Sequence, residues 1–160
     1  MAESVDHEKF MRQALLMAKR GVRLGQTPFG ACIVKDGRVV SVAHNRVWRD
    51  RDITAHAEIV AIRQACKKLR TIDLSGCMIY STCEPCPMCF SACHWARIKT
   101  IFFGARIRDA WQAGFHEMPI SNQEMRQRGH SEVKIIGDCL RDEAMALFAF
   151  WASRKDKHVY

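Results

Sequence analysis

Two short fragments of the sequence carry side chains that could bind a metal ion and move protons. They are TAHAE at residues 54–58 and CEPCPMC at residues 83–89. His56, Cys86 and Cys89 form a set of nitrogen and sulfur ligands, and three protein ligands with one open position are typical of catalytic zinc. The spacing therefore predicts one zinc ion per chain, bound by these three side chains.

Glu58 is the residue that we expect to carry the proton. Two thiolates and a neutral imidazole cancel the charge of zinc, so a bound water is acidified less than it is over three neutral histidines, and a nearby base must help. His56 and Glu58 would be about 200° apart on a regular helix, so both face one site only at a helix entrance. We expect Thr54 to cap that helix.

The elements that must position these residues alternate between helices and strands. The expected elements are a helix over 6–23 capped by Asp6, strands over 31–35 and 39–43 joined by Asp36-Gly37, a helix over 55–69, a strand over 78–81, a helix over 87–96 capped by Cys86, a strand over 100–104, a short helix near Asp109, a strand over 133–136 and a helix over 140–153. This order predicts a single α/β domain over residues 1–160, a three-layer α/β/α sandwich around a mixed sheet.

The composition is that of an ordinary soluble domain. The 160 residues are 48% hydrophobic and 26% charged, and 25 basic against 17 acidic residues give a formal net charge of +8. The apolar runs are too short to cross a bilayer, and the first residues contain no apolar signal core. We therefore expect a cytoplasmic protein without a membrane partner, in which the 8 cysteines are reduced thiols.

The pattern H-x-E followed by P-C-x-x-C is the signature of the zinc nucleobase deaminases, in which the glutamate is an acid/base and not a ligand. The chain resembles this cytidine deaminase superfamily from its first helix through PFGACIVKDG, HNRV, TAHAEIVAIRQAC, CEPCPMC and FFGAR. Within it the chain is most similar to bacterial guanine deaminases, through AGFHE at 113–117 and the aromatic C-terminal residue Tyr160. The resemblance implies a five-stranded sheet, a dimer, and the conversion of guanine to xanthine and ammonia.

The same resemblance implies roles for five further residues. Asn45 would hydrogen-bond the bound base, and Phe29 and Trp95 would be aromatic residues of the pocket. Glu117 would hydrogen-bond the purine and help to move protons to the leaving amine. Tyr160 would close the pocket, and in similar enzymes this segment sometimes comes from the swapped partner of a homodimer.

The departures from the family pattern do not touch the metal residues, so deamination is the expected reaction. The choice of base is not fixed by these residues, and other aminated rings are alternative substrates. Ile53 stands where relatives commonly have proline, and His116 stands where an acid is common. A tRNA adenosine deaminase would share the zinc motif and suit the positive charge, but the basic residues are spread along the chain, so nucleic acid is not the expected partner. The RGH stretch at 128–130 is vaguely similar to cytosine deaminases.

An iron–sulfur protein is the alternative from a different class. Cys83, Cys86, Cys89 and Cys93 reproduce the spacing C-x2-C-x2-C-x3-C. In the ferredoxin pattern proline follows the last cysteine, whereas His94 follows it here, and the sequence has no second compact set of cysteines. We therefore expect Cys83 and Cys93 to pack around the zinc site rather than to bind a cluster.

Overall fold

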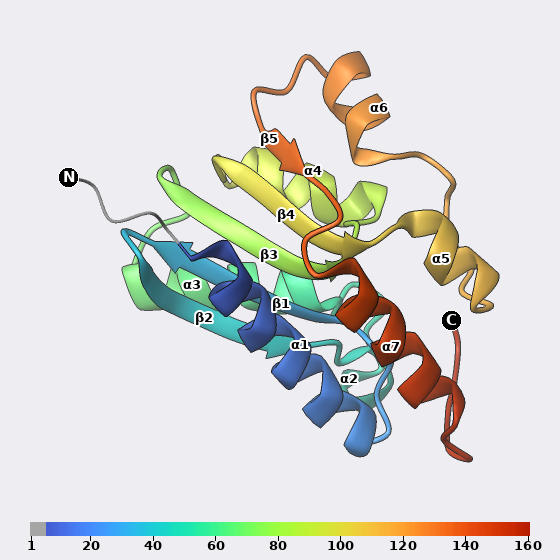
Figure 1. Ribbon diagram of the computed structural model, residues 1–160. Coiled ribbons are helices and arrows are strands. Elements are labelled where there is room, and N and C mark those ends of the chain that lie inside the picture. The colour runs from blue at the N-terminus through green and yellow to red at the C-terminus, as the bar shows by residue number, and fades with distance from the viewer. Residues whose placement is uncertain (1–5) are drawn as a thin grey trace.

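A five-stranded mixed sheet lies at the centre of the computed structural model, which describes residues 6–160 (Figure 1). Its strands are β1 (Gly30–Lys35), β2 (Arg38–His44), β3 (Cys77–Cys83), β4 (Thr100–Ala105) and β5 (Lys134–Ile136), in the spatial order β2-β1-β3-β4-β5. Strand β1 is antiparallel to β2 and β3, whereas β3, β4 and β5 are parallel. The predicted fold class is confirmed.

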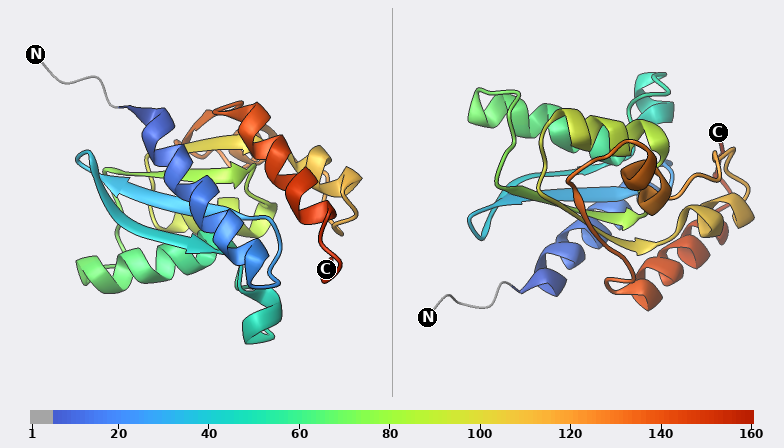
Figure 2. Two further views of the ribbon diagram at one scale, coloured as in Figure 1. Left: turned by 60° about the horizontal axis from the view of Figure 1, so that its bottom comes forward. Right: turned by 90° about the horizontal axis from the view of Figure 1, so that it is seen from above.

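Helices cover both faces of the sheet, as two turned views show (Figure 2). One face packs against α1 (His7–Arg23) and α7 (Arg141–Ala152), and the other packs against α3 (Ala57–Leu69) and α4 (Pro87–Trp95). The shorter helices are α2 (Val47–Asp50), α5 (Ile107–Gln112) and α6 (Asn122–Arg128). No helix within residues 6–160 is both long and apolar enough to span a membrane.

Helix α1 shows why these segments fold where they do. The side chain of Asp6 accepts a hydrogen bond from a backbone N–H of the first turn, which confirms the predicted cap. Phe10, Ala14 and Ala18 recur at helical spacing and are buried against the sheet. Gly30 of β1 permits this close approach, because a Cβ atom there would lie 2.2 Å from the carbonyl oxygen of Ala14.

The β1–β2 hairpin forms at the predicted turn. Asp36 and Gly37 have φ angles of 49° and 70°, the left-handed pair that a two-residue type I′ turn requires. Strand β1 begins one residue earlier than the sequence pattern predicted, at Gly30, and β2 ends one residue later, at His44.

Three local predictions were wrong or incomplete. Thr54 does not cap the second long helix: its hydroxyl and backbone N–H both bond to Asp52, and the helix begins after His56 as the N-cap residue. The sequence pattern also missed α2 and α6. Helix α2 is too short to show a period, and α6 has a single apolar residue, Met125, in its sequence NQEMRQR.

The topology brings the two chemistry-bearing fragments to one end of the sheet. Strand β3 ends at Cys83 and leads directly into α4, while α3 begins beside it on the same face. Side chains at the carboxyl ends of parallel strands and at the first turns of the following helices face a common crevice in open α/β sheets. The structure places His56, Cys86 and Cys89 there.

Candidate active site

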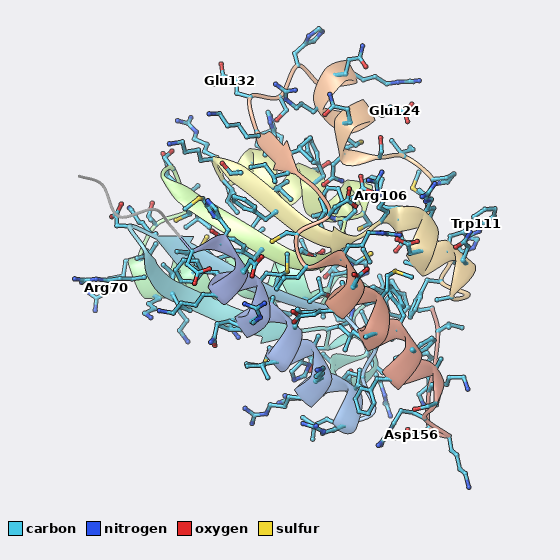
Figure 3. The ribbon with its side chains drawn as sticks, in the orientation of Figure 1. Arg70, Arg106, Trp111, Glu124, Glu132 and Asp156 are labelled. Carbon is cyan, nitrogen blue, oxygen red and sulfur yellow. The ribbon has the colours of Figure 1, made fainter. Side chains whose placement is uncertain are left out.

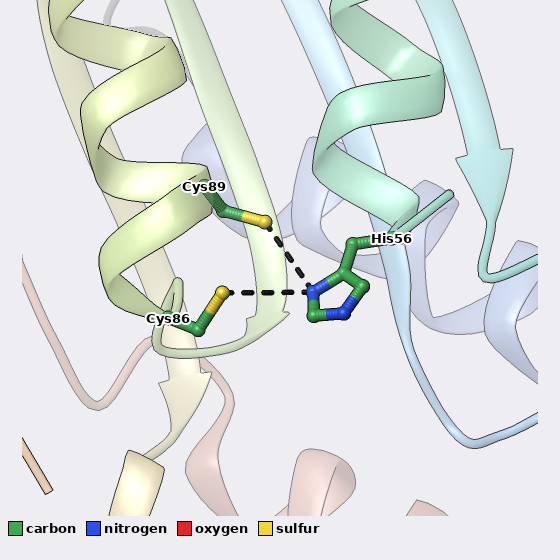
Figure 4. A group of neighbouring side chains, drawn as sticks. All are labelled: His56, Cys86 and Cys89. Carbon is green, nitrogen blue, oxygen red and sulfur yellow. Dashed lines mark hydrogen bonds between the residues drawn. The ribbon is translucent and has the colours of Figure 1, made fainter. Parts of the chain in front are cut away.

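Three potential metal ligands converge where α3 and α4 begin. Nδ1 of His56 lies 3.6 Å from Sγ of Cys86 and 3.5 Å from Sγ of Cys89, so the imidazole faces both sulfur atoms (Figure 4). Cys86 is the N-cap residue of α4 and Cys89 lies one turn further along. Pro87 at the first helical position fixes this entrance, because a proline there loses no hydrogen bond.

The spacing of these atoms fits a tetrahedral zinc ion. Bonds of about 2.3 Å to sulfur and 2.0–2.1 Å to nitrogen place tetrahedral ligands about 3.5–3.6 Å apart, which matches the two measured separations. A hydrogen bond with Cys89 and the neighbouring His56 lower the pKa of the Cys86 thiol to about 4, so this sulfur is ready to bind a metal as a thiolate. His56, Cys86 and Cys89 would hold one zinc ion per chain.

Glu58 lies beside this ligand set. It is in the first turn of α3 and is 6% exposed, and its Oε1 accepts a hydrogen bond of 2.9 Å from the hydroxyl of Ser81 on β3. Burial raises the pKa of Glu58 above its usual range. A carboxyl group held in place with a raised pKa has the properties of a general acid/base.

A small pocket opens from the metal ligands. Its walls include Phe29, Asn45, Glu117 and Tyr160 in addition to Glu58. The space left between these side chains is about 10 Å³, at the lower limit for holding one water molecule. The structure therefore brings together four of the five residues that the family resemblance implies for substrate binding.

Asn45 is fully buried, and both the oxygen and the nitrogen of its side-chain amide have hydrogen-bond partners. Its Oδ1 accepts a hydrogen bond of 3.0 Å from the N–H of Val47, and its Nδ2 donates one of 2.6 Å to the hydroxyl of Tyr160. The ring of Tyr160 lies 5.4 Å from that of His56, centre to centre. The last residue of the chain is thus a wall of the pocket of the same chain.

Glu117 reaches the pocket from the segment between α5 and α6. Burial raises the pKa of Glu117 to about 7. The neighbouring residue His116 donates its backbone N–H to the carbonyl oxygen of Tyr160, at 3.0 Å. This hydrogen bond therefore joins the segment that carries Glu117 to the C-terminal segment beside the pocket.

Trp95 does not line this pocket, contrary to the expectation from the resemblance. It is 83% exposed and lies at the far end of α4 from Cys86, about 13 Å along the helix axis at 1.5 Å per residue. The indole ring of Trp95 is therefore exposed at the opposite end of the helix from the metal ligands.

Sequence reasoning missed two residues of the site. Ser81 holds Glu58, and Glu84 is a pocket residue that is 9% exposed. Glu84 stands inside the motif CEPCPMC, so its position between two cysteines was an available signal. Ser81 offers no such signal, because a serine in a strand becomes informative only when its partner across the fold is known.

The iron–sulfur alternative does not fit the geometry. Within residues 6–160 the group of side chains that could hold a metal consists of His56, Cys86 and Cys89. Cys93 is fully buried in the hydrophobic core, and the thiol of Cys83 donates to the carbonyl oxygen of Arg106 at 3.5 Å. Cys83 and Cys93 are packing residues, as expected.

The family model described as the cytidine and deoxycytidylate deaminase zinc-binding region matches residues 4–105. The chain belongs to this family. The zinc-binding description and the His56, Cys86 and Cys89 cluster agree, so this protein is a zinc-dependent aminohydrolase, referred to below as the deaminase.

The deaminase is similar to enzymes that act on two kinds of substrate. It is 47% identical to the guanine deaminase of Bacillus subtilis over 114 residues, which cover 71% of this chain and 73% of that protein. It is 48% identical to the tRNA-specific adenosine deaminase of Aquifex aeolicus over 98 residues, 61% of this chain and 65% of that protein. The solved structure of a guanine deaminase from Nitrosomonas europaea matches with a TM-score of 0.87 and 29% identity, over 94% of this chain and 87% of that one.

Proposed function

We propose that the deaminase acts on free guanine and converts it to xanthine and ammonia. Since the relatives include both guanine and tRNA deaminases, the pocket must decide between them. The observation that carries the proposal is the enclosure of the pocket by Tyr160, whose hydroxyl bonds to Asn45. A base within tRNA stays joined to ribose and phosphate and needs an open mouth, whereas a free base can be surrounded on every side.

The entrance to the pocket also favours an uncharged small molecule. A hollow of about 270 Å³ adjoins the pocket, and its walls include Ile53, Met88 and Met118 but no lysine or arginine. Contacts between phosphates and basic side chains supply most of the non-specific affinity of proteins for nucleic acids. An apolar entrance of this kind suits a free nucleobase better than an RNA loop.

One group of basic side chains lies away from the metal ligands. A hollow lined by Arg97, Lys99 and Lys134 lies where β4 and β5 begin. The metal ligands lie at the opposite end of the sheet, near Cys83, where β3 ends. The net charge of +8 is therefore no argument for a polyanion at the site.

We infer that guanine displaces Tyr160 in order to pass from the adjoining hollow to Asn45 and Glu58. The present space of about 10 Å³ cannot hold a purine, because it is about the minimum for one water molecule. Asn45, Glu58 and Cys83 lie in or beside the sheet and the first turn of α3, whereas Tyr160 lies in a segment without regular structure and contacts Asn45 through one hydroxyl hydrogen bond. We infer that the C-terminal residue swings aside to admit the base and then closes over it, which excludes bulk water during the reaction.

The side chains have complementary tasks in this reaction. When bound, zinc supplies a Lewis acid that lowers the pKa of the attacking water. Glu58 takes one proton from this water as its oxygen bonds to C2 of guanine, and delivers that proton to the ring nitrogen N3. The second proton passes to the exocyclic amine, the bond from C2 to the amine breaks, and ammonia leaves. Asn45 and Glu117 orient the base by hydrogen bonds, and Phe29 packs beside it.

The C-terminal residue completes the pocket of its own chain in this structure, since Tyr160 bonds to Asn45. The swapped C-terminal segment implied by the family resemblance stays a prediction, which truncation and mixing of subunits in solution would test. The homodimer implied by the family resemblance stays a prediction, which the molecular mass in solution would test.

A screen for released ammonia tests the substrate. The zinc-loaded protein is incubated with guanine, adenine, cytosine, their nucleosides, amino-triazines and an adenosine-containing tRNA anticodon stem-loop. We expect the highest kcat/KM for guanine. Preference for the stem-loop or for cytosine would overturn the guanine assignment while leaving the zinc chemistry in place.

The variant Glu117→Gln tests the contact with the base. It replaces one carboxylate oxygen by an N–H donor that faces the N–H groups of guanine, and the loss of a charge-assisted hydrogen bond costs about 1.5–3 kcal/mol. The expected loss in kcat/KM is about 10- to 150-fold. Unchanged turnover would remove Glu117 from substrate recognition.

A further inference from the structure

Glu84 joins the loop that carries Cys86 to both ends of the segment that carries Glu117. Its Oε1 accepts a hydrogen bond of 2.8 Å from the backbone N–H of Asn122, and its Oε2 accepts one of 3.2 Å from the backbone N–H of Ile107. Its own N–H donates to the carbonyl oxygen of Ala105 at 2.8 Å. Both carboxylate oxygens are thus occupied by backbone groups.

The two donors are the first residues of α5 and α6. Ile107 begins α5 and Asn122 begins α6, and the N–H groups of a first helical turn have no acceptor within their helix. A buried N–H without a partner lowers the free energy of unfolding, so the hydrogen bonds from these two amides to the carboxylate stabilise the folded segment. One side chain therefore fixes both ends of residues 107–122.

Asn122 adds a second link at the same place. It is fully buried, and its Nδ2 donates a hydrogen bond of 2.6 Å to the carbonyl oxygen of Pro85. Pro85 lies between Glu84 and the metal ligand Cys86. The start of α6 is thus attached to the metal-binding loop by a backbone N–H and by a side chain.

The clamped segment carries the groups that close the pocket. Glu117 is one of its members, and the backbone N–H of His116 holds the carbonyl oxygen of Tyr160. Between Ile107 and Asn122 the segment contains α5 and then a stretch without regular structure, residues 113–121. Phe115 packs into the core within this stretch, and the position of Glu117 beyond it depends on how the end at Asn122 is held.

We propose that Glu84 is a positioning residue that sets Glu117 and the C-terminal lid opposite the metal ligands. It acts through its bonds to Ile107 and Asn122 and not by touching the base. The expected effect on turnover rests on the contact between Glu117 and guanine proposed above, whereas the effect on the order of residues 113–121 does not depend on it.

The test compares Glu84→Gln with two variants that make the same chemical change nearby. Glu84→Gln exchanges one acceptor oxygen for an amide whose hydrogens face a backbone N–H. Glu124→Gln changes a carboxylate on α6, at the outside of the molecule (Figure 3), whose oxygen pairs with Arg128. Asp109→Asn removes a buried carboxylate that also supports the start of α5, through the N–H of Arg106, but has no bond to Asn122.

Hydrogen exchange of residues 113–121 and zinc content are measured first, on the zinc-loaded proteins. Glu84→Gln should keep one zinc per chain and should speed the exchange of these amides, including that of His116, at least about tenfold. Glu124→Gln should leave the exchange rates unchanged, and Asp109→Asn should lower the melting temperature without this local effect. Equal exchange in Glu84→Gln and the wild type, or an equal increase in Asp109→Asn, would overturn the proposal.

Steady-state kinetics then test the path through Glu117. We expect Glu84→Gln to lower kcat/KM for guanine at least about tenfold. The double variant Glu84→Gln/Glu117→Gln should have a kcat/KM within about twofold of that of Glu117→Gln alone, because the effects of residues that act as a unit are not additive. Losses that multiply would show that Glu84 acts on the base by itself and would overturn the positioning role. If Glu117→Gln alone were fully active, the proposed contact with guanine would fail and the exchange rates would still decide the clamp.

Glu84→Asp provides a second route if Glu84→Gln does not fold. It keeps the carboxylate charge, but its side chain is one methylene shorter and cannot reach both the N–H of Ile107 and that of Asn122. Faster exchange of residues 113–121 with full zinc content supports the clamp, and unchanged exchange contradicts it.

Discussion

Asn45 and Tyr160 are joined by a hydrogen bond of 2.6 Å, although 115 positions separate them in the chain. Oδ1 of Asn45 accepts from the N–H of Val47, which fixes the amide so that one N–H of Nδ2 faces the pocket and donates to the hydroxyl of Tyr160. In the proposed reaction the base needs this same donor. Binding of the base and displacement of the Tyr160 hydroxyl are therefore linked events.

Deletion of Val159 and Tyr160 should impair guanine turnover while zinc content and folding are retained. The matched variant Tyr160→Phe keeps the ring and loses only the hydroxyl that competes with the base for Asn45, a hydrogen bond worth about 0.5–1.5 kcal/mol, so its kcat/KM should rise about 2- to 10-fold. The truncated chain should instead lose activity, because its pocket stays open to water. A truncated chain as active as the full chain would remove the lid from the mechanism.

Cys86→Ala and Cys89→Ala should each lose the zinc ion. Each leaves two protein ligands, too few for the three-ligand site of a catalytic zinc. Elemental analysis of the purified variants measures the metal directly, and Cys66→Ala serves as the control because Cys66 lies outside the ligand group. Full zinc occupancy in either ligand variant, or iron in the wild type, would contradict the assignment.

Glu58→Gln should keep zinc and lose activity. The amide preserves the shape of the side chain and accepts the hydrogen bond from Ser81 through its remaining oxygen, but it cannot take a proton. The loss of a general acid/base costs about 10²- to 10⁴-fold in kcat. Zinc content and kcat are measured on the same preparation, and normal turnover at full zinc occupancy would mean that another group carries the proton.

Asp109 should contribute stability that depends on pH. Its carboxylate accepts two hydrogen bonds from Arg141, at 2.8 and 3.1 Å, and these bonds hold the pKa of Asp109 below its usual value. A lowered folded-state pKa stabilises the protein above the unfolded pKa of about 3.9, and this contribution is lost as the pH falls through the folded-state pKa. Asp109→Asn should lower the free energy of unfolding by about 1.5–3 kcal/mol at pH 7 and by less below pH ~3.

Asp138→Asn is the matched control for this measurement. Asp138 pairs with Arg106 at 2.6 Å, but its side chain is 48% exposed, so its removal should cost at most about 1 kcal/mol. Urea titrations of both variants at pH 7 and at pH 3 give the comparison. A difference between wild type and Asp109→Asn that stays constant with pH would contradict the role of the ion pair.

The metal ligands and the alternation of helices and strands were predictable from the sequence because both show in short-range patterns. His56, Cys86 and Cys89 belong to two compact motifs, and Pro87 marks the entrance of the helix that positions both cysteines. Asp36-Gly37 similarly specifies its turn by backbone sterics alone. Within each motif and within the turn, the residues that decide the local geometry lie within a few positions of one another, whereas the meeting of His56 with Cys86 across 30 positions depends on the sheet.

The rest of the pocket was decided by tertiary structure, because its contacts join distant parts of the chain. The sequence pattern predicted Thr54 as a helix cap, but its hydroxyl bonds to Asp52 instead. The family resemblance implied Trp95 as a pocket residue, but it is exposed at the far end of α4. The bonds from Asn122 to Glu84 and Pro85 span 38 and 37 positions. Local sequence carries no signal for such pairs, since their free energy comes from burying polar groups that meet only after the sheet has assembled.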